Sequence, residues 1–288
     1  MRLFVVDAFT TQKFSGNPAG VALMAADEEM FSDSFMQHLA CELKHSETVF
    51  VKWADENRFT LRYFTPEGEI DLCGHATIAA FTALRDLDHL PLGHYRALTM
   101  AGELDIEVLD DSVWMDMAPP VEARTFTAEE AAEIYAAYGL PADAMPEGLL
   151  PKSISTGLCD IMLPLKSAEL LERAVQNEAA VTELSKRYGV VGVHMFYPTL
   201  QENETAHCRN FAPLYGIPEE AATGTASGAL TYYLYLHNAI RAGETNRFVQ
   251  GETMGKPSEV LSRLEANGDQ IKIRIGGRAV PSLMLTLL

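Results

Sequence analysis

Hydrophobic and polar side chains alternate along residues 58–64. The apolar side chains Phe59, Leu61 and Tyr63 fall on one face of an extended chain, and the residues between them are polar. Because successive side chains of a strand point to opposite faces, the pattern predicts a half-buried β-strand. Other short segments that read as strands occur in both halves of the chain, at 3–8, 48–53, 104–109, 113–117, 190–197, 247–251, 260–265, 270–275 and 279–288.

Two segments lack a polar face. Residues 74–84 are small or apolar at most positions, and residues 225–238 begin with a similar run of small residues. A helix that is apolar on most sides is buried rather than packed on the surface. The pattern therefore predicts one buried helix in each half of the chain.

The two predicted helices begin after similar stretches of sequence. From Phe64, an aromatic-x-Pro start leads through an acidic loop to Cys-Gly-His-Ala-Thr at 73–77, and from Phe211 the same plan leads to Thr-Gly-Thr-Ala-Ser at 223–227. Two copies about 150 residues apart indicate two similar lobes rather than a solenoid. The alternative is two unrelated buried helices whose starts are both rich in small residues.

Each helix start is a candidate anion site. The first N–H groups of a helix have no partner within it and form the positive end of its dipole. Such a start binds a carboxylate well. If the two lobes face each other, both starts converge on one cleft.

The fold class predicted is α+β, with each lobe a highly curved sheet around one buried helix. The boundary falls at Pro119-Pro120, which gives lobes of 1–118 and 119–288, and the final strand at 279–288 is a candidate for return to the N-terminal lobe. The chain contains no GxGxxG, P-loop or GxSxG motif, so a nucleotide-binding or hydrolase assignment has no support.

The composition disfavours some classes of binding partner and indicates the compartment. The 288 residues carry a formal net charge of −18, which disfavours nucleic acid and anionic lipid as partners. No apolar run is long enough to span a membrane, and Met1–Asp7 is too short for a signal-peptide core. The 4 cysteines are scattered, which suits a reducing compartment, so we expect a cytoplasmic protein.

The histidines do not indicate a metal site. The 8 histidines form no HxH or HExxH motif, and His75, His194 and His207 could meet only through the fold. We therefore expect no metal and no other cofactor.

A thiol is one candidate for the chemistry. Cys73 at a helix start would have a lowered pKa and could act as a base. A two-thiol racemase needs a second cysteine at the matching place, where this chain has Thr223, so that mechanism is disfavoured. Cys73 could instead pack as a small buried residue.

Carboxylate acid–base chemistry is the other candidate. Glu47 lies at a predicted helix-to-strand junction, and Glu219 and Glu220 precede the second helix. A partly desolvated Glu near the helix starts could deprotonate a carbon acid, while the helix starts stabilise the developing enolate, and His75 could relay a proton. The alternative for Glu219 and Glu220 is an acidic stretch that favours the helix dipole.

The ordered motifs of the chain resemble those of one family. They are Phe-x-Gly-Asn-Pro-Ala at 14–19, Ser-Glu-Thr-x-Phe-Val at 46–51, Phe-Thr-Pro at 64–66, Gly-His-Ala-Thr at 74–77, Ser-Thr-Gly at 155–157, Arg-x-Phe-Ala-Pro at 209–213, Ala-Thr-Gly-Thr-Ala at 222–226, Gln-Gly at 250–251 and Met-Gly-Lys-Pro-Ser at 254–258. Together they resemble the phenazine-biosynthesis PhzF-like isomerases of the diaminopimelate epimerase-like superfamily. The resemblance spans nearly the whole chain.

The resemblance implies a cofactor-independent isomerase with two pseudo-symmetric lobes, an active site between them and a homodimeric assembly. The family's catalytic glutamate falls on Glu47, its Gly-His pair on Gly74 and His75, and its second acidic residue, an Asp followed by Pro, on Glu220 followed by Ala221. The chain thus departs from the family pattern at both positions of that second motif.

We therefore expect an isomerase that moves a proton within a small, amino-acid-like carboxylate substrate, with Glu47 as general acid and base. Two alternatives remain, a one-thiol amino-acid racemase or epimerase that uses Cys73, and a non-catalytic binding protein for small acids. The expected catalytic residues are Glu47, Glu220 and His75, and the expected substrate-binding residues are Asn17, Ser46, Cys73, Gly74, Ala76, Thr77, Thr223, Gly224 and Thr225.

Overall fold

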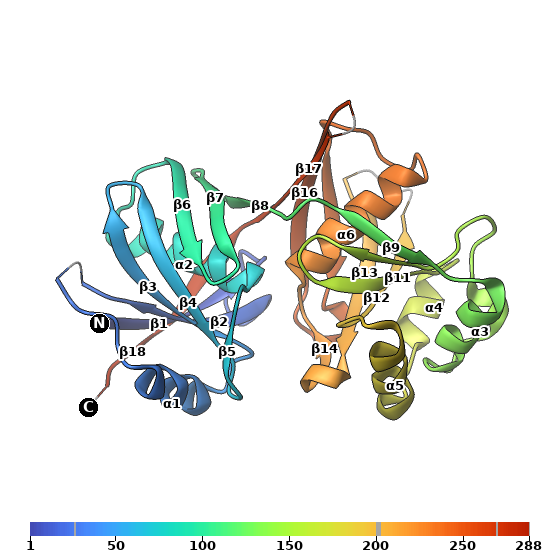
Figure 1. Cartoon of the computed structure of the whole chain (residues 1–288), viewed down its shortest axis with the longest axis horizontal. Helices are drawn as coiled ribbons and strands as arrows, with labels where there is room; N and C mark the ends of the chain where they lie inside the picture. The colour runs from blue at the N-terminus through green and yellow to red at the C-terminus, as the bar shows by residue number, and fades with distance from the viewer. Residues whose placement is uncertain (26, 200–202, 269, 288) are drawn as a thin grey trace. The chain divides into compact units, whose positions relative to one another are not determined.

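A computed structural model describes residues 1–25, 27–199, 203–268 and 270–287 (Figure 1). The chain divides into two compact units. Unit 1 comprises Met1–Asp116 together with Gly276–Leu288, and unit 2 comprises Met117–Ile275. The C-terminal strand thus belongs with the N-terminal half of the chain, because it pairs with the first strand.

Unit 1 is a curved, mostly antiparallel sheet. Its strands are β1 (Arg2–Ala8), β2 (Asn17–Leu23), β3 (Thr48–Asp55), β4 (Arg58–Phe64), β5 (Glu69–Ile70), β6 (Gly93–Thr99), β7 (Gly102–Val108), β8 (Val113–Asp116) and β18 (Ala279–Leu285). Pairing follows the order β18-β1-β2-β3-β4-β6-β7-β8, with β5 on the end of β4. The β2–β3 and β4–β6 pairs are parallel, and the others are antiparallel.

Unit 2 repeats this plan. Its strands are β9 (Val121–Thr125), β10 (Lys152–Ser155), β11 (Cys159–Pro164), β12 (Gly192–Pro198), β13 (Ala206–Ala212), β14 (Ile217–Glu220), β15 (Thr245–Gln250), β16 (Ser258–Asn267) and β17 (Gln270–Gly277). Pairing follows β9-β10-β11-β12-β13-β15-β16, with β14 on the end of β13. Here β11–β12 and β13–β15 are the parallel pairs.

The central element of unit 1 is the helix α2 (Gly74–Asp88), which Figure 1 shows within the curve of the strands. Every residue from Gly74 to Leu84 is buried, and the helix packs against β1, β2, β3, β7, β8 and β18. The ring of Phe81 lies 5.3 Å from that of Phe59 and 6.2 Å from that of Tyr95. The apolar run at 74–84 thus fills the space that the sheet encloses.

The helix α6 (Gly224–Leu236) takes the same place in unit 2, where it packs against β10, β11 and β16. Its first turns approach the sheet closely. The hydroxyl of Thr156 donates to the carbonyl of Thr225 at 2.9 Å. A Cβ atom on Gly228 would lie only 2.8 Å from the Thr156 hydroxyl oxygen, so the glycine permits this approach.

The sequence repeat is therefore also a repeat of topology. In unit 1, β3 pairs antiparallel with β4, β4 carries β5, α2 follows, and β6 returns parallel to β4. In unit 2, β12, β13, β14, α6 and β15 make the same pairings in the same order. Two copies of one supersecondary unit account for the matched helix starts.

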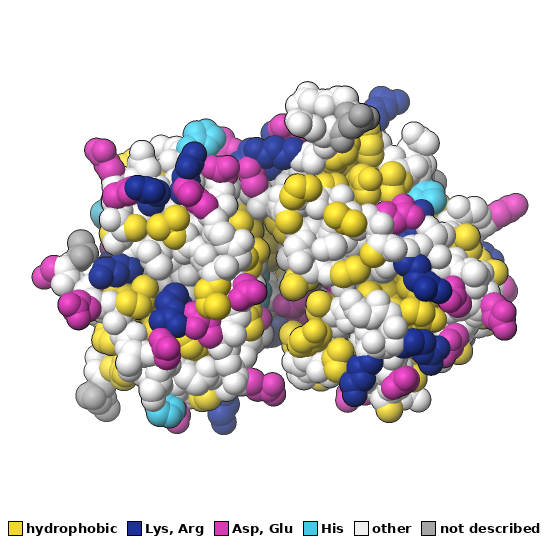
Figure 2. Space-filling view, in the orientation of Figure 1, with side chains coloured by type: hydrophobic (Ala, Val, Ile, Leu, Met, Phe, Trp, Pro, Cys, Tyr) yellow, Lys and Arg dark blue, Asp and Glu magenta, His cyan; other side chains and the backbone are white. Residues whose placement is uncertain are grey.

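Shorter helices cover the outside of each sheet. Unit 1 has α1 (Asp33–Leu43), and unit 2 has α3 (Ala128–Ala136), α4 (Ala168–Arg173) and α5 (Glu178–Tyr188). Apolar residues of α3, α4 and α5 form one core cluster with β11 and β12. Figure 2 shows acidic and basic side chains scattered over the visible face. Among the described residues, no helix combines the length and apolar character needed to cross a membrane.

Strand β2 includes the Asn-Pro-Ala-Gly segment at 17–20. Asn17 pairs with Ala8 and Gly20 pairs with Val5. The turn before it requires a glycine, because Gly16 has φ +68° and a Cβ there would lie 2.3 Å from the carbonyl oxygen of Ala8. The loop is also closed by a 2.7 Å hydrogen bond from the Phe14 N–H to the Asp7 carboxylate.

We expect Phe81→Ala to lower the free energy of unfolding of unit 1 by about 3–5 kcal/mol, because it leaves a cavity between α2 and the sheet. Both tryptophans, Trp53 and Trp114, belong to unit 1, so their fluorescence during denaturation reports on that unit. Leu92→Ala is the control, since Leu92 is 56% exposed and its loss should cost less than about 0.5 kcal/mol. Equal effects of the two changes would contradict the central role of α2.

Candidate active site

Glu47 lies immediately before β3, after α1 and a short connection. Its carbonyl accepts a 3.0 Å hydrogen bond from the N–H of Gly20, which ties the segment to β2. Glu47 is only 7% exposed, although its carboxylate is ionisable. A buried carboxylate on a well-held backbone is expensive in free energy and marks a candidate functional site.

The helix start of α2 brings two more reactive side chains to Glu47. The imidazole Nε2 of His75 lies 3.3 Å from Oε2 of Glu47. The other ring nitrogen, Nδ1, lies 3.3 Å from Sγ of Cys73. The imidazole of His75 therefore stands between a carboxylate and a thiol, and all three residues are buried.

The electrostatics of His75 follow from this setting. Burial lowers the pKa of His75 from its usual value, because an imidazolium loses hydration inside the protein, and the charge of Glu47 opposes the shift. The ring is therefore neutral at pH 7. The Nε2–Oε2 contact has the length of an ion pair without hydrogen-bond geometry, and no described protein group donates a hydrogen bond to Oε2 of Glu47. That oxygen can accept a proton from a ligand.

The two buried helices differ from the outer helices in their caps. The side chains of Ser32, Thr127, Ser167 and Asn177 cap α1, α3, α4 and α5. In the described residues, neither Cys73 at the start of α2 nor Thr223 at the start of α6 caps its helix with its side chain. The first-turn N–H groups of the buried helices are thus not taken by a capping side chain, which suits an anionic ligand.

The other expected residues of unit 1 surround the same helix start. Gly74 and Ala76 are buried in the first turn of α2, Asn17 is buried at the start of β2, and Ser46 directly precedes Glu47. Thr77 has two protein contacts, because its hydroxyl donates to the carbonyl of Cys73 at 2.7 Å and lies 2.7 Å from the hydroxyl of Tyr63. These contacts hold the first turn against β4.

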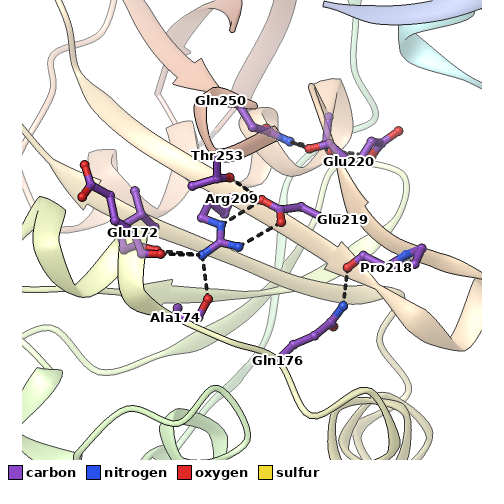
Figure 3. Close-up of polar contacts among 11 residues, drawn as sticks. Glu172, Ala174, Gln176, Arg209, Pro218, Glu219, Glu220, Gln250 and Thr253 are labelled. Atoms are coloured by element: carbon purple, nitrogen blue, oxygen red, sulfur yellow. Dashed lines mark hydrogen bonds and ion pairs between the residues drawn. The ribbon is translucent and has the colours of Figure 1, made fainter. Parts of the chain in front are cut away.

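In unit 2, Glu220 belongs to a chain of hydrogen bonds at the start of α6. The amide of Gln250 donates to the Thr223 hydroxyl at 3.2 Å, and that hydroxyl donates to Oε2 of Glu220 at 2.5 Å. The same amide donates to the Glu220 carbonyl at 2.7 Å, as Figure 3 shows. The Thr223 proton thus points to the Glu220 carboxylate, which accepts it. Gly224 and Thr225 follow as the first residues of α6.

The neighbouring Glu219 has a different role. Nε and one terminal nitrogen of Arg209 donate to its two oxygens at 2.8 and 2.9 Å (Figure 3). Arg209 also donates to the carbonyls of Leu171 and Ala174, each at 2.8 Å, and Thr253 donates to Glu219 at 2.9 Å. Glu219 is thus engaged in holding β14 to β13, and Glu220 is the better candidate for acid–base chemistry.

Unit 1 contains the counterpart of this ion pair. Arg62 of β4 donates to both oxygens of Glu69 in β5, at 2.7 and 2.5 Å. Each arginine also lies over the phenylalanine two residues later, Arg62 over Phe64 at 5.3 Å and Arg209 over Phe211 at 4.9 Å. Glu69 and Glu219 each stand four residues before the helix N-cap. This matched arginine–glutamate pair, which shapes the loop before each buried helix, was not predicted, although the matched spacing is visible in the sequence.

A separate hollow of about 440 Å³ lies elsewhere in unit 1, lined by Asp55, Glu56, Asn57, Arg58 and Arg96. It lies at the opposite end of β3 from Thr48, where the chain turns into β4. Its side chains pair with one another, as in the ion pair of Arg58 with Asp55. The hollow is therefore distinct from the group formed by Glu47, Cys73 and His75.

Comparisons with known proteins agree with this architecture. Residues 6–284 match the PhzC-PhzF family, described as phenazine biosynthesis-like protein. A protein of Deinococcus radiodurans named as an uncharacterized isomerase is 34% identical over 284 residues, which cover 95% of this chain and 90% of the relative. The crystal structure of a Bacillus anthracis phenazine biosynthesis protein of the PhzF family superposes with a TM-score of 0.88 at 26% identity, covering 100% of this chain and 99% of the other. The structure of a predicted epimerase from Pseudomonas aeruginosa has a TM-score of 0.82 at 25% identity, covering 100% and 99%.

The chain therefore belongs to the family of PhzF-like isomerases. The resemblance inferred from the ordered motifs is confirmed, and so is the expected α+β fold of curved sheets around buried helices. The family assignment identifies neither the substrate nor the residues that act on it. Those conclusions depend on the geometry of the two helix starts.

We expect the imidazole of His75 to titrate in the folded protein with a midpoint below about 6.5, the ordinary value for histidine, because burial disfavours its charged form. Because the unfolded state binds this proton more readily, His75 makes the folded state lose stability as pH falls below about 6.5. Glu47→Gln should lower the midpoint further, since the carboxylate charge favours imidazolium. Nitrogen-15 NMR of labelled histidine measures both midpoints, and a midpoint that rises in Glu47→Gln would contradict the assigned contact.

We expect Arg209→Met to destabilise unit 2 by about 3–5 kcal/mol, because it leaves Glu219 and two carbonyls without their buried partner. Hydrogen exchange measured by mass spectrometry should accelerate at 213–223 and stay unchanged at 65–73. The matched variant Arg62→Met should show the reverse, with a smaller cost of about 1 kcal/mol, since its ion pair is more exposed. Unchanged exchange at both loops would show that the ion pairs do not hold them.

Proposed function

We propose that the protein is a cofactor-independent isomerase that transfers a proton within a small carboxylate-bearing substrate, with Glu47 as general acid and base. The observation that carries the proposal is the buried carboxylate of Glu47 beside the start of α2, which has no side-chain cap. The carboxylate of Glu47 can take a proton, and the start of α2 can stabilise negative charge. A carbon acid next to a carboxylate needs both.

The proposed reaction proceeds in two steps. Glu47 takes a proton from the carbon next to the substrate carboxylate, so that the C–H bond breaks and an O–H bond forms on Glu47. The electron pair enters an enolate, whose charge the N–H groups at Gly74 and His75 stabilise at the positive end of α2. Glu47 then returns the proton to a different position on the substrate, which completes the isomerisation without a redox cofactor.

His75 supports the proposal as a neutral group between Glu47 and Cys73. Its contact with Oε2 of Glu47 at 3.3 Å lets it orient the carboxylate or exchange a proton with it. In unit 2, we propose that Glu220 serves as a second carboxylate and that the N–H groups of Gly224 and Thr225 contact the substrate. The Thr223 hydroxyl, directed by Gln250, orients the Glu220 carboxylate in this scheme.

The contact between Cys73 and His75 favours a second candidate function, a one-thiol racemase or epimerase of an amino acid. A thiol 3.3 Å from a neutral imidazole can lose its proton to the ring and become a base. Thr223 stands at the matching N-cap of α6, and its hydroxyl is too weakly acidic for the second thiol's role. The proposal that Glu47 is the base is therefore better supported than a thiol base. The third possibility is a protein that binds small acids without turnover, and the experiment below tests all three.

We expect wild-type protein in D₂O to exchange deuterium into at least one compound of a panel of amino, hydroxy and unsaturated carboxylic acids, followed by proton NMR. Glu47→Gln should slow this exchange by about 10²- to 10⁴-fold, the usual contribution of a general base. Glu56→Gln is the matched control, because Glu56 is an exposed glutamate at the far end of β3, and its rate should equal that of wild type.

The remaining outcomes separate the alternatives. Exchange that survives Glu47→Gln and disappears in Cys73→Ala would assign the base to the thiol. Tight binding of a panel compound without exchange by wild type would identify a binding protein. Either result would overturn Glu47 as the base.

A further inference from the structure

The side chains of Glu47, Cys73 and His75 form a donor set that the proton-transfer scheme does not fully use. One ligand atom from each residue can be chosen so that all three lie within 4.8 Å of one another, and all three residues are buried. A carboxylate oxygen, a thiol sulfur and an imidazole nitrogen are the three ligand types that Zn²⁺ takes from proteins. The motif spacing gave no hint of this set, because Glu47 is 26 residues from Cys73 in sequence and reaches it only through the fold.

We propose that Glu47, Cys73 and His75 bind a single thiophilic divalent cation, such as Zn²⁺, and that this cation inhibits the enzyme. The binding itself depends only on the geometry of unit 1. The inhibition rests on the proposed function, since an ion on Glu47 would occupy the oxygen that is proposed to accept the substrate proton.

One distance between ligand atoms already matches a tetrahedral site, and all the chosen ligand atoms lie within 4.8 Å of one another. Bond lengths of about 2.0–2.3 Å place the ligand atoms of tetrahedral Zn²⁺ roughly 3.3–3.6 Å apart. Sγ of Cys73 and Nδ1 of His75 already lie 3.3 Å apart. The 3.3 Å contact of Glu47 is with the other ring nitrogen, Nε2, so its carboxylate has to move toward the Nδ1 side to complete the set. No described protein group holds Oε2 by a hydrogen bond that would oppose this movement.

The charges also balance. A glutamate carboxylate and a cysteine thiolate together carry two negative charges, which neutralise a divalent ion in a buried place where an uncompensated charge would be costly. The start of α2 opposes a cation with a partial charge of about +0.5, which is small beside the charge of the two anionic ligands. Binding requires the thiolate, so the ion displaces the Cys73 proton, which is released to solvent.

The site has three protein ligands and leaves a fourth position open. Three protein ligands with an open position are typical of zinc sites that exchange their outer ligand. An ion held by Glu47 would occupy the carboxylate that the proposed reaction needs to accept the substrate proton. The substrate and the cation would thus compete for Glu47.

The test uses Cd²⁺ and Co²⁺ as spectroscopic probes on the full-length, reduced and chelator-free protein. We expect one equivalent of Cd²⁺ to produce a thiolate charge-transfer band, with release of one proton, and one equivalent of Co²⁺ to give the visible bands of a tetrahedral ion. Cys73→Ser should abolish the cadmium band. Glu47→Gln and His75→Asn should keep the fold and lower the affinity for the ion by at least about tenfold. Even changes to residues that only support the ligands commonly lower metal affinity about 10- to 100-fold.

Cys41→Ser and Cys159→Ser are the matched controls, since neither cysteine belongs to the donor set. Both should bind Cd²⁺ as wild type does. Circular dichroism checks that each variant folds, and Cys73→Ala replaces Cys73→Ser if the serine variant does not. A band that survives loss of Cys73, equal affinities in wild type, Glu47→Gln and His75→Asn, or no band in wild type would each overturn the proposal.

The result is independent of the proposed reaction, because the spectra need no substrate. If deuterium exchange is found, Zn²⁺ should suppress it, added substrate should raise the Zn²⁺ concentration required, and a chelator should restore it. If the spectra establish the ion while no compound exchanges deuterium, the metal site stands and the isomerase proposal fails. Exchange that is insensitive to stoichiometric Zn²⁺ would overturn the inhibitory role.

Discussion

The structure depends on burying, in each unit, a helix that has almost no polar face. A sheet must curve around such a helix to remove it from water, and the start of the helix then lies inside the protein. In the described residues, the N-cap side chain caps neither of these helices. The packing therefore places two helix starts without a side-chain cap among buried residues, where a low dielectric strengthens the effect of the helix dipole.

The loop before each helix start has to keep its shape, and an arginine–glutamate pair does this in both units. Arg62 with Glu69 and Arg209 with Glu219 each join neighbouring strands through two hydrogen bonds. Planar, bidentate geometry restricts the backbone more than a single contact would. The more buried pair is also tied to carbonyls of the α4 segment, so the position of the α6 start depends on packing well beyond the loop.

The two copies share a scaffold and differ in chemistry. At the helix N-cap, Cys73 of unit 1 corresponds to Thr223 of unit 2, and two residues later His75 corresponds to Thr225. The carboxylates also come from different elements, since Glu47 directly precedes β3 while Glu220 is the last residue of β14. A thiol, an imidazole and a carboxylate of the described residues therefore meet in unit 1, at the start of α2.

The sequence alone determined the two buried helices, the repeat, the α+β class and the family, because these follow from local periodicity and from motifs that are short and ordered along the chain. It also singled out Glu47 and His75. The sequence also named the final strand as a candidate for return to the N-terminal lobe, and in the structure this strand pairs with the first. Only the tertiary structure decided that Glu47 meets Cys73 and His75, and that Glu219 is held by Arg209 while Glu220 is held by Thr223. Glu47 is far from Cys73 and His75 in the chain, and the geometry of the other contacts depends on strand pairing and burial that local pattern does not encode.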